Sequence, residues 1–153
     1  MTLLLDTHAL LWWLRKDARF SARARAVVTD PSSELLFSVA GAWEIAIKCA
    51  LGQLTLAVDP ATYVTTQLQI NGIRALSIEL AHALAVYSLP QHHKDPFDRL
   101  LVAQAVQPAL FAFGDFCHGR LGEVQGYSRE LAAAKRIQQR RLKLEENSDS
   151  TNR

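Results

Sequence analysis

The sequence predicts an α/β domain in which a mostly parallel sheet of about four strands lies between helices. Short apolar runs alternate along the chain with longer segments of helical character. Strands that alternate with helices in this way form parallel sheets covered on both faces. With 153 residues, of which 49% are hydrophobic and 21% charged, the chain is long enough for one globular core.

The predicted strands are apolar runs, each ending near a polar residue or a chain-breaking residue. The first strand and its turn occupy residues 2–8, where an apolar run closes on Asp6. Such a run, placed before an apolar helical segment, is typical of a buried parallel strand. The other strands are expected at 34–38, 73–78 and 109–113.

The predicted helices carry recognisable start and stop signals. Ser21 and Asp95 stand at N-cap positions, Pro60 and Pro96 at first helical positions, and Gly52 at a C-cap. The expected helices are 8–14, a short helix within 17–29, 39–51, 60–70, 79–87 and 95–106. We expect the buried face of the third helix to consist of Val39, Trp43, Ile47, Ala50 and Leu51.

Composition and cysteine usage limit the class of protein. The net charge is only +2, so the electrostatic field of the molecule as a whole does not indicate nucleic-acid binding. Cys49 and Cys117 lack zinc-ligand or CxxC spacing, which favours a reducing compartment without disulfides. The first apolar run contains Asp6 and His8 and has no basic leader, so we expect neither a signal peptide nor a membrane span. A soluble, cytoplasmic protein is predicted.

The character of the chain changes beyond Asp115. Residues 1–115 are expected to form the globular domain, and 116–126 an irregular connector with three glycines. Residues 127–146 are rich in Ala, Leu, Gln, Arg and Lys, which predicts a basic helical extension. Residues 147–153 are expected to be disordered.

Four carboxylates, Asp6, Glu44, Asp98 and Asp115, are expected near the carboxyl edge of the same sheet. Each follows a predicted strand or lies early in a helix. Gathered without a cation they would repel one another, whereas Mg²⁺ prefers such oxygen ligands together with water and phosphate. The pattern therefore predicts a hard-cation site suited to phosphodiester hydrolysis.

Each acid also has a purely structural interpretation. Asp6 is placed to cap a helix, Glu44 to pair with Lys48, Asp98 to complement a helix dipole and Asp115 to make a turn. Only their joint placement favours the metal site. Motifs for nucleotide cofactors and serine hydrolases are absent from the sequence.

Three segments together resemble one known family. LLLDTHALLWWL (3–14), AWEIAIK (42–48) and HHKDPFDRLLVAQA (92–105) resemble the PIN-domain ribonuclease toxins of bacterial type II toxin–antitoxin modules, the VapC-like proteins. The resemblance implies a three-layer α/β/α PIN-like domain over residues 1–115 and an endoribonuclease dependent on Mg²⁺ or Mn²⁺. The family's acidic positions fall on Asp6, Glu44 and Asp98. It further implies a small cognate antitoxin and a homodimer.

The fourth acid departs from the family pattern. The family usually ends this strand with Thr, a variable residue and Asp, whereas here the segment reads LFAFGD, with Phe113 at the Thr position. Asp115 is the natural candidate. The helix and final strand that normally follow are not recognisable in 116–126.

The resulting hypothesis is RNA hydrolysis by a metal-activated water, with Lys94 and Arg99 contacting phosphates. A catalytically impaired relative that still binds antitoxin is an alternative. A phosphoacceptor receiver domain is disfavoured because Thr7 and His8, not a second acid, follow Asp6. Nucleic-acid binding through the basic tail alone is the third alternative.

Overall fold

The computed structural model describes residues 1–89, 95–106 and 110–113, the last of these for the backbone only. Several predictions fall outside the described residues. They concern Lys94, Asp115, Cys117, the connector 116–126, the basic helix 127–146 and the tail 147–153.

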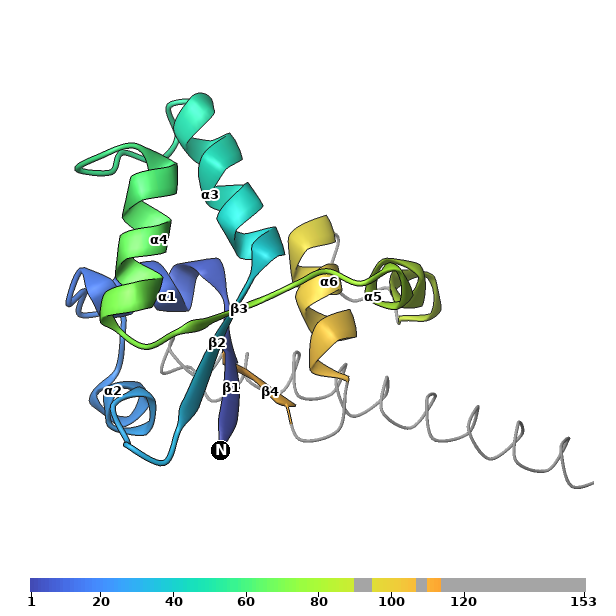
Figure 1. Cartoon of the computed structure of the whole chain (residues 1–153), viewed down its shortest axis with the longest axis horizontal. Coiled ribbons are helices and arrows are strands. Elements are labelled where there is room, and N and C mark those ends of the chain that lie inside the picture. Colours follow the sequence, from blue (N-terminus) through green and yellow to red (C-terminus); the bar gives the residue numbers. More distant parts are fainter. Residues whose placement is uncertain (90–94, 107–109, 114–153) are drawn as a thin grey trace, which may run out of the picture.

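A parallel sheet forms the centre of the molecule (Figure 1). Its strands are β1 (Thr2–Leu5), β2 (Glu34–Ser38), β3 (Arg74–Leu76) and β4 (Leu110–Phe113), in the order β3-β2-β1-β4. All three pairings are parallel. The predicted mostly parallel sheet is confirmed, and the first strand of the chain occupies an inner position in it.

Helices cover both faces of the sheet. The odd-numbered Leu3 and Leu5 of β1 join a core cluster with side chains of four helices, whereas Leu4 packs with Leu101 and Ala105 of the last helix. Since alternate residues of a strand point to opposite faces, β1 is buried on both sides. The helices are α1 (Thr7–Leu14), α2 (Ala22–Val28), α3 (Val39–Ala50), α4 (Pro60–Ile70), α5 (Leu80–Ala85) and α6 (Pro96–Ala105), with a 3-10 turn at Val86–Ser88.

The predicted caps are found at the helix starts. The Ser21 side chain accepts a hydrogen bond from the Ala24 N–H, and Asp95 accepts one from the Phe97 N–H. Pro60 and Pro96 open α4 and α6. Each cap satisfies a backbone donor that has no partner within the helix.

Two further predictions concern the state of the cysteines and the presence of a membrane span. Cys49 is a free thiol. Within the part of the chain that the structure describes, none of the helices is both long enough and apolar enough to cross a membrane.

The predicted buried face of α3 is wrong. Its buried residues are Ala40, Gly41, Glu44 and Ile45, while Trp43 is 58% exposed. Val39 and Leu51 are exposed as well, Ala50 is exposed, and Ile47 is only half-buried. Two neighbouring stripes of α3 have helical spacing, and the one with the small residues Ala40 and Gly41 faces inward because it permits close approach to the sheet.

Gly41 is required at this close approach. A Cβ atom placed on it would lie 2.7 and 2.8 Å from ring atoms of Phe37 and 3.0 Å from Thr7 Oγ1. Phe37 is itself only 1% exposed, so its ring has little room to move.

We therefore expect Gly41→Ala to lower the free energy of unfolding by about 1 kcal/mol, since overpacking costs about 1–3 kcal/mol and the helix-propensity gain of alanine recovers about 1 kcal/mol. Urea denaturation measures the change. In a Phe37→Leu background, which removes the ring, the loss caused by Gly41→Ala should shrink. An equal loss in both backgrounds would contradict the steric explanation.

Candidate functional site

The carboxyl edge of the sheet brings Asp6 and Ser38 to neighbouring positions. Leu5 of β1 is in register with Phe37 of β2. Asp6 directly follows Leu5, and Ser38 directly follows Phe37. Asp6 is half-buried and caps α1, where its Oδ1 accepts a hydrogen bond of 2.6 Å from the Ala9 N–H. The capping role and the position at the sheet edge therefore belong to the same carboxylate.

Glu44 enters the site from α3, which begins immediately after β2. Its side chain faces inward, the residue is only 9% exposed, and Oε1 accepts a hydrogen bond from Lys48 Nζ at 2.5 Å. A carboxylate this deeply placed requires a positive partner, and Lys48 supplies one from the next turn of the helix. The predicted Glu44–Lys48 pair is confirmed as a contact.

Asp98 lies in the first turn of α6 and is half-buried. Because α6 precedes the parallel strand β4, its first turn lies at the same carboxyl edge as the ends of β1 and β2 (Figure 1). A negative charge there is favoured by the helix dipole. The rings of Trp43 and Phe97 make an edge-to-face contact, with centroids 5.3 Å apart, that joins α3 to this turn.

A buried polar network fixes α6 against the sheet. The Ser38 hydroxyl donates to Gln104 Oε1 at 2.6 Å and accepts from the Ala40 N–H at 3.0 Å. Gln104 Nε2 in turn donates to the Ser77 carbonyl oxygen at 3.0 Å. Ser38 and Gln104 are fully buried, so the network ties the ends of β2 and β3 to the helix that carries Asp98.

Thr7 contributes a buried hydroxyl directly after Asp6. The residue is 2% exposed, and its Oγ1 atom has no hydrogen-bond partner in the described structure. An unsatisfied buried hydroxyl costs about 1–3 kcal/mol, so the position suits a bound water or ligand group.

The structure thus places Asp6 and Asp98 at the carboxyl edge of the sheet, and Glu44 on the helix that begins at this edge. Among residues 1–89, 95–106 and 110–113, no three His, Cys, Asp or Glu side chains gather closely enough to hold a metal ion. The donors are nevertheless of the type that a hard cation takes, because Asp6 and Asp98 offer carboxylate oxygens and the buried Thr7 Oγ1 has no partner in the described structure.

The guanidinium of Arg99 has a structural contact. Its Nη2 atom donates to the carbonyl oxygens of Val86 and Leu89 at 2.8 and 3.2 Å. These bonds fasten α6 to the 3-10 turn. A role of Arg99 in binding RNA stays a prediction, as does that of Lys94.

The residues that sequence reasoning missed are Gln104, Thr7 and the exposed Trp43 with its half-buried partner Phe97. Gln104 left one signal, since it is a polar residue inside an apolar helical stretch. No signal in the sequence identified Trp43 as exposed, because an indole at helical spacing is normally a core residue.

Residues 3–110 match the PIN domain, and the chain therefore belongs to the PIN-domain family. Its fold, a parallel sheet between helices, agrees with the resemblance in its three sequence segments.

Two curated relatives, both from Mycobacterium tuberculosis, narrow the resemblance within the family to VapC proteins. Ribonuclease VapC16 is 41% identical over 58 residues, which cover 38% of this chain and 41% of the relative. Ribonuclease VapC22 is 27% identical over 107 residues, which cover 69% of this chain and 80% of the relative. The matched region thus spans about two fifths of VapC16 but most of VapC22. No solved structure matches the chain significantly.

We expect Gln104→Met to lower the free energy of unfolding by about 1–3 kcal/mol, because the fully buried Ser38 hydroxyl loses its acceptor and the part-buried bond to the Ser77 carbonyl oxygen is lost as well. Urea denaturation of this variant, Ser38→Ala and the double variant forms a thermodynamic cycle. The losses of unfolding free energy in the two single variants should sum to more than the loss in the double variant. Gln69→Met, at an exposed position on α4, is the matched control. Strict additivity would show that the Ser38–Gln104 bond is not a coupled unit.

Proposed function

We propose that this chain is a divalent-metal-dependent endoribonuclease that acts as the toxin of a type II toxin–antitoxin module. The observation that carries the proposal is the topology of a PIN domain in which Asp6 follows β1 and Asp98 begins α6 at the carboxyl edge of the sheet, while Glu44 lies on the helix that starts at that edge. The names of the relatives, both ribonucleases, support the same substrate class.

In this proposal Asp6, Glu44 and Asp98, together with Asp115, hold Mg²⁺ or Mn²⁺. When bound, the cation supplies Lewis-acid activation of water and neutralises charge on the reacting phosphate. Asp6 can serve as ligand and cap at once, because a carboxylate offers about four lone-pair positions and the bond from the Ala9 N–H uses one of them. Asp95 is assigned to capping alone, and it is the more exposed acid of the pair.

Substrate contacts in this proposal come from basic groups beside the acids. Lys94 precedes α6, and Arg99 lies in its first turns. Arg99 already donates through Nη2 to two carbonyl oxygens, so its contact with phosphate is proposed in addition to these bonds. Such contacts weaken as salt rises, since they replace counterions on the nucleic acid.

The proposed partners follow the same family relationship. A small cognate antitoxin would neutralise the chain, and a second copy would form a homodimer. An RNA substrate places the proposed activity in the cytoplasm.

A second candidate is a catalytically impaired PIN-domain protein that retains the fold and antitoxin binding. The observation favouring it is the sequence of 108–126, where Phe113 replaces the expected Thr and the usual closing helix and strand are not recognisable. Metal binding without RNA turnover would support this candidate over the active toxin.

We expect Asp6→Asn and Asp98→Asn each to reduce Mn²⁺-dependent RNA cleavage by at least about 100-fold, a size typical of losing a group that positions catalytic charge. Asn caps helices as well as Asp does, so Asp6→Asn removes the charge and keeps the cap. Cleavage of a labelled RNA is measured with Mn²⁺, with Mg²⁺ and with chelator.

Asp95→Asn is the matched control, because it neutralises an acid at the start of the same helix without changing the proposed ligands. It should retain activity. Full cleavage by Asp98→Asn, or activity that survives chelation, would rule out the proposed metal site.

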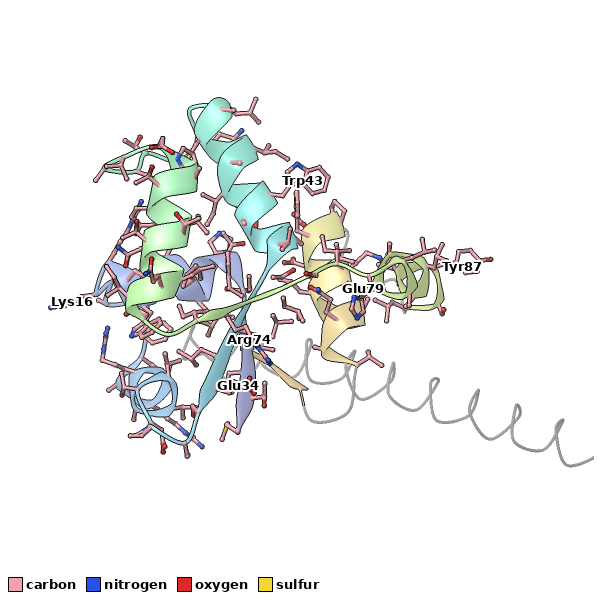
Figure 2. All side chains as sticks on the ribbon, viewed as in Figure 1. Lys16, Glu34, Trp43, Arg74, Glu79 and Tyr87 are labelled. Carbon is pink, nitrogen blue, oxygen red and sulfur yellow. The ribbon has the colours of Figure 1, made fainter. Side chains whose placement is uncertain are left out.

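We also expect Lys48→Gln to raise Mn²⁺ affinity by roughly 30-fold, since removing a unit positive charge about 4 Å from a divalent cation is worth about 2 kcal/mol in water. Titration calorimetry measures the change. Arg74→Gln is the control: it breaks the Arg74–Glu34 pair, at the amino ends of β2 and β3 (Figure 2). Unchanged affinity in Lys48→Gln would exclude Glu44 as a ligand.

A further inference from the structure

Trp43 exposes a large aromatic surface at the edge of the candidate site. The residue is 58% exposed, and Val39, one turn earlier on α3, is 43% exposed. An indole contributes to folding mainly through the apolar surface that it removes from water. Because more than half of the Trp43 surface stays in contact with water, much of this stabilisation is lost. Packing in the hydrophobic core therefore does not explain why an aromatic residue occupies this position.

The ring is held in place by Phe97. The two ring planes are inclined by 70°, with centroids 5.3 Å apart, which is an edge-to-face arrangement. Such a contact is favourable for aromatic pairs, and it orients the indole without placing a second ring parallel to it. Trp43 lies beside the first turn of α6 (Figure 2). The aromatic surface is therefore both accessible and pre-oriented.

Both rings adjoin proposed metal ligands in the sequence. Trp43 immediately precedes Glu44, and Phe97 immediately precedes Asp98. Successive residues on a helix point in directions about 100° apart, which is why Glu44 faces inward while Trp43 faces solvent. The ring pair thus stands at the rim of the acidic site.

We propose that Trp43, braced by Phe97, stacks against a nucleobase of single-stranded RNA next to the phosphate that is cleaved. This inference rests on the proposed ribonuclease function and adds the way the substrate is held. Carboxylates at the sheet edge repel a polyanion, whereas stacking on a neutral ring does not depend on charge. Unstacked bases of single-stranded RNA are commonly bound on aromatic side chains, with little dependence on sequence.

The test measures RNA affinity separately from cleavage. The full chain, Trp43→Ala and Trp43→Phe are titrated against a short, unstructured, fluorescently labelled RNA in chelator at low salt, and anisotropy gives Kd. Trp43→Ala should raise Kd about 5- to 150-fold, the loss expected for one stacked base. Trp43→Phe should recover most of the affinity. Tyr87→Ala, which removes an aromatic residue 95% exposed beyond α5, should leave Kd unchanged.

A second arm identifies the stacked base. Single abasic nucleotides are placed at each position of the RNA in turn. One position should lower the affinity of the unmodified chain and have no further effect on Trp43→Ala. This coupling would not arise from a general loss of stability, and circular dichroism of each variant records the fold.

Unchanged Kd in Trp43→Ala, or an equal loss in Tyr87→Ala, overturns the proposal. If Trp43→Ala separates a dimer in size-exclusion chromatography and shows no abasic coupling, the ring belongs to an interface with a second copy, and the proposal also fails. If the unmodified chain cleaves RNA and the Kd of Trp43→Ala is unchanged, the stacking proposal fails and the ribonuclease proposal stands. Base-coupled binding without any metal-dependent cleavage would instead refute the ribonuclease proposal and leave stacking supported.

Discussion

The burial of β1 on both faces is the constraint on which the rest of the structure depends. Thr2–Leu5 has a parallel neighbour on each side, and its leucines alternate between two core clusters. A strand in that position requires helices on both faces of the sheet. It also brings the chain out of the sheet at Asp6, beside the ends of its neighbours. The fold and the position of the first candidate ligand therefore have the same cause.

The orientation of α3 is the second determinant of the site. The helix starts without a linker after β2, and Gly41 lets it approach the ring of Phe37. That approach selects which stripe of the helix is buried, so Glu44 is turned inward and Trp43 outward. The same rotation thus decides the position of one carboxylate and the accessibility of one aromatic ring. On the other face of the sheet, Gln104 fixes α6 to the end of β2 and so positions the turn that carries Asp98.

Asp6 and Glu44 have structural roles that do not depend on the proposed metal site. Asp6 caps α1, and Glu44 is paired with Lys48. These contacts give both acids a hydrogen-bond partner within the chain. The contacts are also of a kind that a cation can share or replace, because a carboxylate has two oxygens and an ammonium group is a flexible partner.

The sequence by itself determined the order and type of the elements, the parallel sheet and the caps at Ser21 and Asp95, since these depend on local periodicity and on local hydrogen bonding. The topology of a parallel sheet is likewise enough to predict that Asp6 and Asp98 lie at one sheet edge, because strands end and helices begin there. Only the tertiary structure decided which stripe of α3 is buried, since the pattern contained two stripes and close packing at Gly41 chose between them. The partners of Gln104 and Arg99 were likewise decided by long-range packing, which no local pattern records.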